Sequence, residues 1–257
     1  MKILAIGDIF GSTGRKVIKN YLSELKAEKL VDLVIANVEN TTHGKGISIQ
    51  HYQELKGYGI DVMTSGNHIF HLPETKKHLE KVSDLLRPLN SNPYHLGLGT
   101  ILISHQDKKI RVTNLIGTTF MPVSSQNPYF ALEEVLENQD WDIHLVDFHA
   151  ETTAEKNAFA LYFDGKISAL WGTHTHVQTA DERILPLGTA FISDAGLTGP
   201  YGGVIGAQLE GVIQRSKYGL PAKILPHKDK GQFNGVIFEF DNTSNRVISI
   251  ERIKKVF

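Results

Sequence analysis

The sequence predicts an α/β protein built as a four-layer α/β/β/α sandwich, in which two mixed sheets stack and helices cover both outer faces. Three observations predict this class. Short apolar strands alternate with amphipathic helices over the first part of the chain, which is typical of parallel pairing. Hairpin patterns in the middle and at the end add antiparallel pairs. Turn residues are spread evenly and no repeat or low-complexity tract marks a boundary, so we expect a single domain over residues 1–257.

The first part of the chain is expected to alternate strictly between strands and helices. Apolar residues at helical spacing support the first helix, and Ser48 is suited to cap the second. Pro73 stands at the favoured first position of the third helix. In chain order we expect a strand at 3–6, a helix at 14–29, a strand at 32–37, a helix at 48–58, a strand at 61–65 and a helix opening at Pro73.

The rest of the chain is predicted to mix hairpins with further strand–helix units. Residues 105–108 suit a hairpin loop, and Thr152 with Glu155 forms a possible capping box. The predicted elements are strands at 99–104 and 109–117, a helix at 128–138, a strand at 142–148, a helix from 152 to about 162, strands at 166–172 and 189–193, a helix around 204–216 and a terminal hairpin of 235–240 and 246–253.

Composition excludes several classes of protein. The 257 residues include no cysteine, which excludes disulfides, thiolate zinc sites and iron–sulfur clusters, so any metal must be held by oxygen and imidazole nitrogen. The net charge of −1 and the lack of a basic run argue against stable binding of a nucleic-acid duplex. The first apolar run is shorter than a signal peptide, and no stretch approaches the ~20 residues of a membrane span. We therefore expect a cytoplasmic protein without membrane association.

Ligand-capable side chains follow five of the predicted strands. Because ligand sites of open α/β sheets lie beyond the carboxyl ends of strands, these side chains are expected to converge. Taken singly, Asp8 or Asn67 could be a plain turn residue, and His149 could be a packed, hydrogen-bonded histidine. Their occurrence together indicates a site. Its candidate members are Asp8, Glu39, Asn40, Asn67, His68, His149, His174 and His176.

The segment GTHTH at residues 172–176 is the most specific part of this set. Two histidines two residues apart leave an apolar strand, and Gly172 permits close approach, so both imidazoles can face one point. Carboxylate, amide and imidazole groups together suit a pair of metal ions. Two ions about 3.5–4 Å apart can activate a bridging water and clamp a phosphoryl group, which is what hydrolysis of a phosphate ester requires. The pattern therefore indicates a phosphoesterase.

The order of the motifs resembles that of calcineurin-like metallophosphoesterases. GDIFG, NVEN, GNH, DFHAE and GTHTH carry the resemblance, and their particular forms are similar to the YmdB-like branch over essentially the whole chain. The resemblance implies a metallophosphoesterase-like fold, with Glu39 bridging two ions and His68 donating a proton to the leaving alkoxide. It further implies Asp8, Asn40 and His176 on one ion and Asn67, His149 and His174 on the other.

Two residues depart from the pattern of the wider superfamily. Phe10 stands where a histidine is usual, and Glu39 stands where the bridging residue is usually aspartate. Asn40 can offer an oxygen in place of the missing imidazole. The ligand set shifts toward oxygen, which is compatible with iron or manganese as the two bound ions.

The substrate and the assembly are implied by the resemblance alone. The branch is associated with hydrolysis of 2′,3′-cyclic mononucleotides and with oligomers, so a small nucleotide substrate and a homo-oligomer, either dimer or tetramer, are implied. Two alternatives remain open. The same metal site could serve a phosphomonoesterase or protein phosphatase. The chain could instead be a non-catalytic regulator that binds metal and a nucleotide or RNA end, although such a module needs no general acid.

Other polar and glycine-rich segments have plainer interpretations. Residues 199–206 read as a turn, with a loop on the substrate side as the alternative. Residues 118–130 read as a loop, with a lid, a base-stacking surface or a subunit contact as alternatives. The remaining histidines are expected to be ordinary surface or packing residues: His43, His51, His71, His78, His95, His105, His144 and His227.

Overall fold

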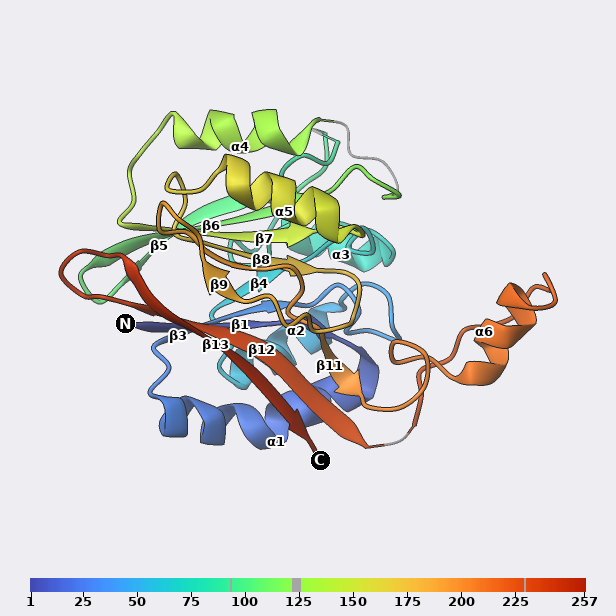
Figure 1. The fold of residues 1–257 in the computed structure, drawn as a ribbon. Helices are drawn as coiled ribbons and strands as arrows, with labels where there is room; N and C mark the ends of the chain where they lie inside the picture. Colours follow the sequence, from blue (N-terminus) through green and yellow to red (C-terminus); the bar gives the residue numbers. More distant parts are fainter. Residues whose placement is uncertain (93, 122–125, 229) are drawn as a thin grey trace.

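Two stacked sheets form the centre of the molecule (Figure 1). The structure is a computed structural model that describes residues 1–92, 94–121, 126–228 and 230–257. Helices lie on the outer face of each sheet, and apolar side chains fill the space between the sheets. The predicted four-layer α/β/β/α arrangement of two mixed sheets is therefore confirmed. The single domain over residues 1–257 stays a prediction.

The first sheet is assembled from both ends of the chain. Its strands are β1 (Lys2–Ile6), β2 (Asp8–Ile9), β3 (Leu33–Asn37), β4 (Val62–Thr64), β11 (Leu197–Pro200), β12 (Gly231–Phe240) and β13 (Val247–Val256). The described residues give the order β2-β11-β12-β1-β3-β4, with β13 paired to β12. β1, β3 and β4 are parallel, as the alternation of strands and helices predicts, whereas β12 pairs antiparallel to β1.

The second sheet comes from the middle of the chain. Its strands are β5 (Thr100–His105), β6 (Lys108–Ile116), β7 (Ile143–His149), β8 (Ala169–Thr173), β9 (Arg183–Ile184) and β10 (Ala190–Ile192). The described residues give the order β5-β6-β7-β8-β10-β9. β5 and β6 form the predicted hairpin, while β6, β7, β8 and β10 run parallel. The carboxyl ends of these parallel strands thus share one edge.

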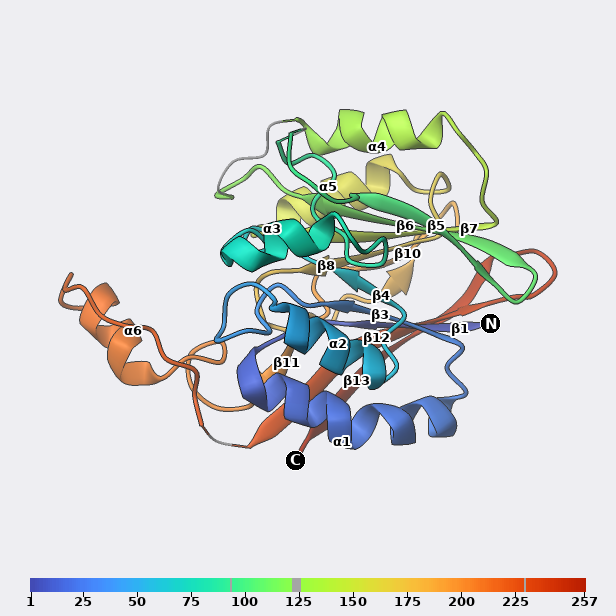
Figure 2. The same cartoon turned by 180° about the vertical axis from the view of Figure 1, so that it is seen from behind.

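Helices shield the two outer faces. α1 (Gly11–Lys29) and α2 (Ile49–Gly57) cover the first sheet, α4 (Pro128–Leu136) and α5 (Thr153–Tyr162) cover the second, and α3 (Pro73–Leu79) lies at the edge of the sandwich (Figure 2). Leu22 of α1 belongs to the outer core of the first sheet, and Phe159 of α5 stacks on Phe148 of β7 in that of the second. Ile35 and Leu145 belong to the core between the sheets.

The starts of α2, α3 and α5 agree with the prediction. At α5, however, only half of the predicted capping box forms. Ser48 caps α2 by accepting a hydrogen bond from the His51 amide, and Pro73 opens α3. Thr152 Oγ1 accepts from the Glu155 amide at 3.3 Å. The Glu155 carboxylate, however, accepts from the Thr118 amide at 2.7 Å rather than completing the capping box.

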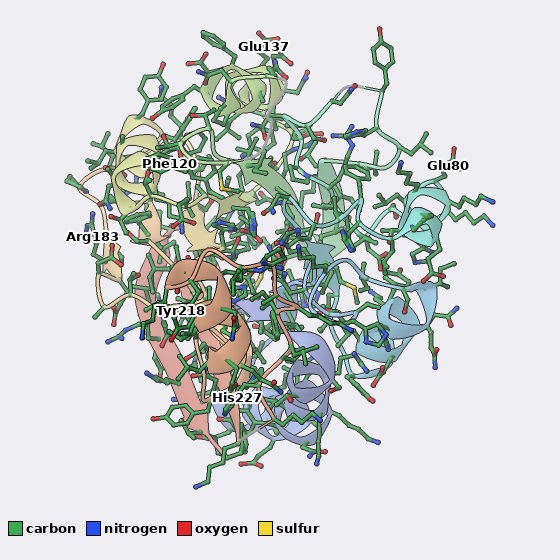
Figure 3. All side chains as sticks on the ribbon, turned by 90° about the vertical axis from the view of Figure 1, so that its right-hand side faces the viewer. Glu80, Phe120, Glu137, Arg183, Tyr218 and His227 are labelled. Carbon is green, nitrogen blue, oxygen red and sulfur yellow. The ribbon has the colours of Figure 1, made fainter. Side chains whose placement is uncertain are left out.

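The described part of the chain between β11 and β12 forms an arm, which projects from the edge where the parallel strands end (Figures 1 and 3). It carries α6 (Leu209–Ser216), which begins later than the predicted 204–216 because Val204 and Ala207 exchange backbone hydrogen bonds in a tight turn. Tyr218, on the segment after α6, is 55% exposed. Of the segment 118–130, residues 122–125 lie outside the described residues. No helix in the described ranges is long and apolar enough to cross a membrane.

Candidate metal centre

The predicted site residues meet where the carboxyl ends of both sheets adjoin. Asp8 begins β2, Glu39 follows β3, and Asn67 follows β4 in the first sheet. From the second sheet, His149 is the last residue of β7 rather than the residue after it, and His174 follows β8. Residues spread over most of the sequence therefore lie within contact distance of one another, as expected from the topology.

One group of contacts centres on the His149 imidazole. Its Nε2 atom lies 3.0 Å from Asn67 Oδ1 and 3.2 Å from Glu39 Oε1. The Nδ1 atom of His174 lies 3.1 Å from the same nitrogen. One ligand atom from each of Glu39, His149 and His174 falls within 4.8 Å of the others, which is compact enough for a single cation.

A second group of contacts lies beside the first and centres on His176. The His176 Nε2 atom lies 3.2 Å from Asn40 Oδ1 and 3.9 Å from Asp8 Oδ1. Asp8 also accepts a hydrogen bond from the His174 amide at 3.1 Å, which joins the two groups. The contacts thus divide the residues into the same two sets that the resemblance implies. Their role as ligands stays a prediction.

Phe10 occupies the place where the superfamily usually has a histidine. Its ring lies edge-on to the His176 ring, with centroids 5.6 Å apart and an interplanar angle of 77°. The side-chain amide of Asn40 donates to Gly44 O at 3.1 Å, which turns its oxygen toward His176. An amide oxygen and an apolar ring therefore stand where an imidazole would supply a ligand.

One buried carboxylate oxygen of the site lacks a hydrogen-bond donor among the described residues. Asp8 is fully buried, and its Oδ1 atom has no hydrogen-bond partner among the described residues. Burial raises the pKa of Asp8, since the charged form is poorly solvated there. An oxygen that is buried without a donor is costly unless a cation lies nearby. The donor set of carboxylate, amide and imidazole groups therefore fits metal ions.

Glu39 and His149 form an ionic pair in the buried centre. Burial opposes ionisation of both, but each stabilises the charge of the other. Against burial, the neighbouring carboxylate raises the pKa of His149 to about 9. Against burial, the neighbouring imidazole lowers the pKa of Glu39 to about 2. The Glu39 carboxylate thus holds a positive charge beside it, at the place where a cation could replace the proton of His149.

The nitrogen of each imidazole that points away from the cluster is engaged by an acceptor. His174 Nε2 lies 2.9 Å from the Glu151 carboxylate, and His176 Nδ1 lies 3.0 Å from the carbonyl oxygen of Ile205. Such partners fix the ring orientation and leave the opposite nitrogen free to bind a metal. Glu151 was not predicted, although it lies inside the DFHAE motif, because its role depends on how the His174 ring is turned.

The loop that carries His174 and His176 has an unusual backbone. Both residues have positive φ angles, of 101° and 64°, which side chains other than glycine rarely adopt. A buried ion pair holds the loop in this shape. Lys156 Nζ donates to Thr173 O at 2.9 Å and to Asp194 Oδ2 at 2.8 Å, and the same Asp194 oxygen accepts from the Thr175 amide at 3.1 Å.

Glycines allow the strands to approach each other at the centre. A Cβ atom at Gly66 would overlap the His149 ring, and one at Gly172 would overlap the carbonyl oxygen of Ser193. Gly172 therefore permits close approach of β8 to the segment after β10. The predicted need for glycine at this position is met, but the close neighbour is backbone rather than a metal ligand.

A cavity of about 730 Å³ opens above the cluster. Glu39, Asn40, His174 and His176 are among the residues that line it, and so is His68. One wall is apolar and consists of Phe10, Leu72, Ile205, Ala207, Ile224 and Pro226. His43 and His71, which are exposed as expected of surface histidines, also line the cavity. Ile205 lines the cavity as well, so part of the segment 199–206, for which a turn or a loop on the substrate side was expected, faces the cavity.

His68 lies next to the cluster with its ring in the cavity. Its backbone amide donates to Glu39 Oε2 at 2.8 Å, which anchors the residue to the buried carboxylate. Its ring Nδ1 atom lies 3.3 Å from Asn67 Nδ2. Burial lowers the pKa of His68 below its usual value, which favours the neutral form of the ring.

Comparison with known proteins identifies the family and the fold of this chain. Residues 4–253 match the model of the YmdB-like protein family. The chain is 40% identical to the Bacillus subtilis 2′,3′-cyclic-nucleotide 2′-phosphodiesterase over 255 residues, which cover 98% of this chain and 96% of that protein. A crystal structure of a phosphatase from Mycoplasma pneumoniae superposes with a TM-score of 0.96 at 44% identity, over 100% of this chain and 93% of that one.

A more distant structure shares the fold alone. The structure titled as a 5′-nucleotidase of Staphylococcus aureus matches 98% of this chain and 53% of its own length, with a TM-score of 0.59 and 18% identity. The predicted metallophosphoesterase-like fold is confirmed by these structures, and the predicted enzyme class, a phosphoester hydrolase, is confirmed by the relatives. From the match over residues 4–253, the chain belongs to the YmdB-like family.

Proposed function

We propose that this chain is a dinuclear-metal phosphodiesterase that hydrolyses small cyclic nucleotides, with 2′,3′-cyclic mononucleotides as its substrates. The observation that carries the proposal is the packing of two carboxylates, two amides and three imidazoles in one cluster, four members of which line a cavity. The B. subtilis relative, named as a 2′,3′-cyclic-nucleotide 2′-phosphodiesterase, supports the choice of substrate.

In the proposed centre, Glu39 contributes to both metal positions. Asp8, Asn40 and His176 would hold one ion, and Asn67, His149 and His174 the other, with iron or manganese as the metals. Two bound cations would supply positive charge to the phosphoryl group and acidify a water molecule at neutral pH. With Glu39 counted in both sets, the first offers three oxygen donors and one imidazole nitrogen and the second two of each, which agrees with these metals.

His68 is the proposed general acid. Its ring lines the cavity, outside the closest contacts of the cluster, and its amide is fixed by Glu39. From there the imidazole can give a proton to the ribose oxygen that leaves phosphorus, which general acid catalysis requires. Lys45 also lines the cavity and would face the negative phosphate oxygens.

We propose that the base of the substrate packs against the apolar wall of the cavity. Phe10, Leu72, Ile205 and Ile224 line the cavity next to the polar floor, and the latter two come from the projecting arm. A phosphate held at the floor would leave the base against these side chains. Their aliphatic and aromatic groups offer contact without hydrogen bonds, so we propose a broad tolerance of bases.

Self-association is part of the proposal. Leu209, Tyr218 and Leu220 of the arm are each more than half exposed. Apolar side chains grouped on a projecting segment favour contact with another copy, as a dimer or tetramer. Light scattering at micromolar concentration tests this, and a monomeric mass would contradict it.

A substrate screen tests the proposed activity. The protein is reconstituted with Mn²⁺ or Fe²⁺ and supplied with 2′,3′-cyclic mononucleotides, 3′,5′-cyclic mononucleotides, linear dinucleotides and nucleoside monophosphates. We expect the 2′,3′-cyclic substrates to give the highest kcat/KM. Preference for monophosphates would instead indicate a phosphomonoesterase, and absence of turnover with every compound would favour a non-catalytic regulator.

A further inference from the structure

A buried chain of polar groups lies behind His149, on the side of the ring away from Glu39. The His149 Nδ1 atom lies 3.0 Å from Thr173 Oγ1, and Thr173 Oγ1 lies 2.7 Å from Asp147 Oδ1. His149, Thr173 and Asp147 are all 0% exposed. The proposed reaction gives Thr173 and Asp147 no direct part, and polar groups so deeply buried are costly unless their hydrogen bonds are complete.

Strand register creates this chain. Asp147 and His149 are two residues apart on β7, so their side chains point to the same face of the sheet. His149 pairs with Thr173 on the adjacent strand β8. The hydroxyl of Thr173 is thereby held between the carboxylate and the imidazole.

The side chain of Asn37 limits the directions of the hydrogen bonds in this chain of polar groups. Its side-chain oxygen accepts from the Glu39 amide at 3.2 Å, so its NH₂ group faces inward. That group lies 3.3 Å from Thr173 Oγ1 and 3.2 Å from Asp147 Oδ2. An amide NH₂ can only donate, and its two hydrogens are shared among these two oxygens and the carbonyl oxygen of Ser65, 3.3 Å away.

Because Asn37 can only donate, the single proton of the Thr173 hydroxyl is left for one of its two other neighbours, Asp147 or His149. Asp147 also receives a hydrogen bond from the Thr64 hydroxyl at 2.5 Å, and as a carboxylate it can only accept. The hydroxyl of Thr173 must therefore donate its proton to Asp147 and accept a hydrogen bond from His149. A hydrogen must then stand on the Nδ1 atom of His149, so Nε2, on the side of Glu39 and Asn67, is the nitrogen that can exchange its proton for a metal ion.

We propose that Asp147 and Thr173 act as positioning residues, which hold the proton of His149 on Nδ1 so that Nε2 is presented to a metal ion. This inference rests on the proposed function only in taking the cluster to be a metal site. It assigns a role to Asn37, Thr64, Thr173 and Asp147 as one unit. A hydroxyl inserted between carboxylate and imidazole replaces the direct contact that carboxylates often make with metal-binding histidines.

Two substitutions of one residue separate this role from simple packing. Thr173→Val keeps the shape of the side chain and removes the hydroxyl, whereas Thr173→Ser keeps the hydroxyl. Mn²⁺ binding to the metal-free wild type and to both variants is measured by calorimetry at pH 8. We expect Thr173→Val to weaken one of the two binding events by roughly 10- to 100-fold, and Thr173→Ser to stay within about threefold of the wild type.

Equal affinity in the valine and serine variants would overturn the inference. So would a valine variant whose metal-free form unfolds more easily while its Mn²⁺ affinity is unchanged, because packing alone would then explain the residue. Wild-type protein that takes up no Mn²⁺ would overturn the proposed function together with this inference. Lack of turnover on every nucleotide, with normal metal binding, would leave the inference standing.

A measurement on the wild type guards against a variant that fails to fold. The protein is loaded with diamagnetic Zn²⁺, and the ¹⁵N chemical shifts and proton couplings of the His149 ring are recorded. We expect the ring proton on Nδ1. A ring that carries its proton on Nε2, or a proton that exchanges freely between the two nitrogens, would contradict the proposal.

Discussion

The Nε2 atom of His174 lies 2.9 Å from the Glu151 carboxylate, while the Nδ1 atom of the same ring faces His149. Glu151 therefore orients a ring that the proposed centre uses. We expect Glu151→Ala to weaken Mn²⁺ binding by about tenfold, since loss of such a partner lets the ring turn. Calorimetry on the metal-free protein measures this. Glu137→Ala, on the surface far from the cavity, is the control, and equal affinities in the two variants would contradict the prediction (Figure 3).

Replacement of the proposed general acid should depend on the leaving group. His68→Asn removes the proton donor, and we expect kcat for 2′,3′-cyclic mononucleotides to fall by roughly 10²- to 10⁴-fold. A p-nitrophenyl phosphodiester should lose far less, because nitrophenolate leaves without a proton. Rates for both substrates and the metal content of the variant are measured together. A similar loss on both substrates, with normal metal content, would exclude His68 as the acid.

Ile224 should affect substrate affinity more than turnover. It is 37% exposed on the apolar wall of the cavity, where a base would cover it. We expect Ile224→Ala to raise KM for cyclic nucleotides about fivefold, from loss of ~1 kcal/mol of apolar contact, with kcat little changed. Methyl p-nitrophenyl phosphate, which has no base, should show a smaller rise. Ile248→Ala, on β13 and 56% exposed, is the control, and an equal change in both variants would refute the assignment of the wall.

His144 should make stability depend on pH away from the active site. It is fully buried, and this burial, with Arg111 nearby, lowers its pKa to about 3. The unfolded chain binds a proton at this histidine below pH ~6.5 whereas the folded chain does not, so stability falls as pH drops from 6.5 toward 3. We expect about 1.4 kcal/mol of the loss in unfolding free energy between pH 7.5 and 5.5 to come from this residue.

The variant His144→Gln isolates this contribution. Glutamine does not titrate and can still reach the Thr113 hydroxyl, which lies 2.9 Å from His144 Nε2. Urea unfolding of wild type and variant at both pH values gives the difference. An identical pH dependence in the two proteins would show that folding leaves the pKa of His144 unchanged, which would contradict the prediction.

The topology was predictable because local patterns and connection rules agree. Strands alternating with helices fix the parallel order of β1, β3 and β4, and the turn before Lys108 fixes the hairpin. β11 could not be recognised, because its Leu-Thr-Gly-Pro sequence carries turn residues and only its place between β2 and β12 makes it a strand. The start of α6 depends on a turn at Val204–Ala207 that apolar spacing hides.

The candidate cluster was predictable because its members sit at strand ends, which the topology brings to one edge. The polar groups behind the cluster could not be predicted from the sequence. Asp147 and Thr173 lie within strands, where their side chains read as sheet residues, and their contacts depend on the register between β7 and β8. Glu151 and the Lys156–Asp194 pair depend on the positive φ angles of the GTHTH loop, which residue types alone do not specify.

Substitution of the bridging carboxylate tests the account most directly. Glu39 is 1% exposed and lies 3.2 Å from His149 Nε2, and Glu39→Gln keeps its shape while it removes its charge. With Glu80→Gln on the surface as control, turnover of a phosphodiester, metal stoichiometry and thermal unfolding are measured on the Mn²⁺-loaded proteins (Figure 3). We predict a folded Glu39→Gln protein whose turnover falls by roughly a thousandfold, from loss of several kcal/mol of charge stabilisation. Wild-type turnover in Glu39→Gln, with two metal ions bound, would contradict the account.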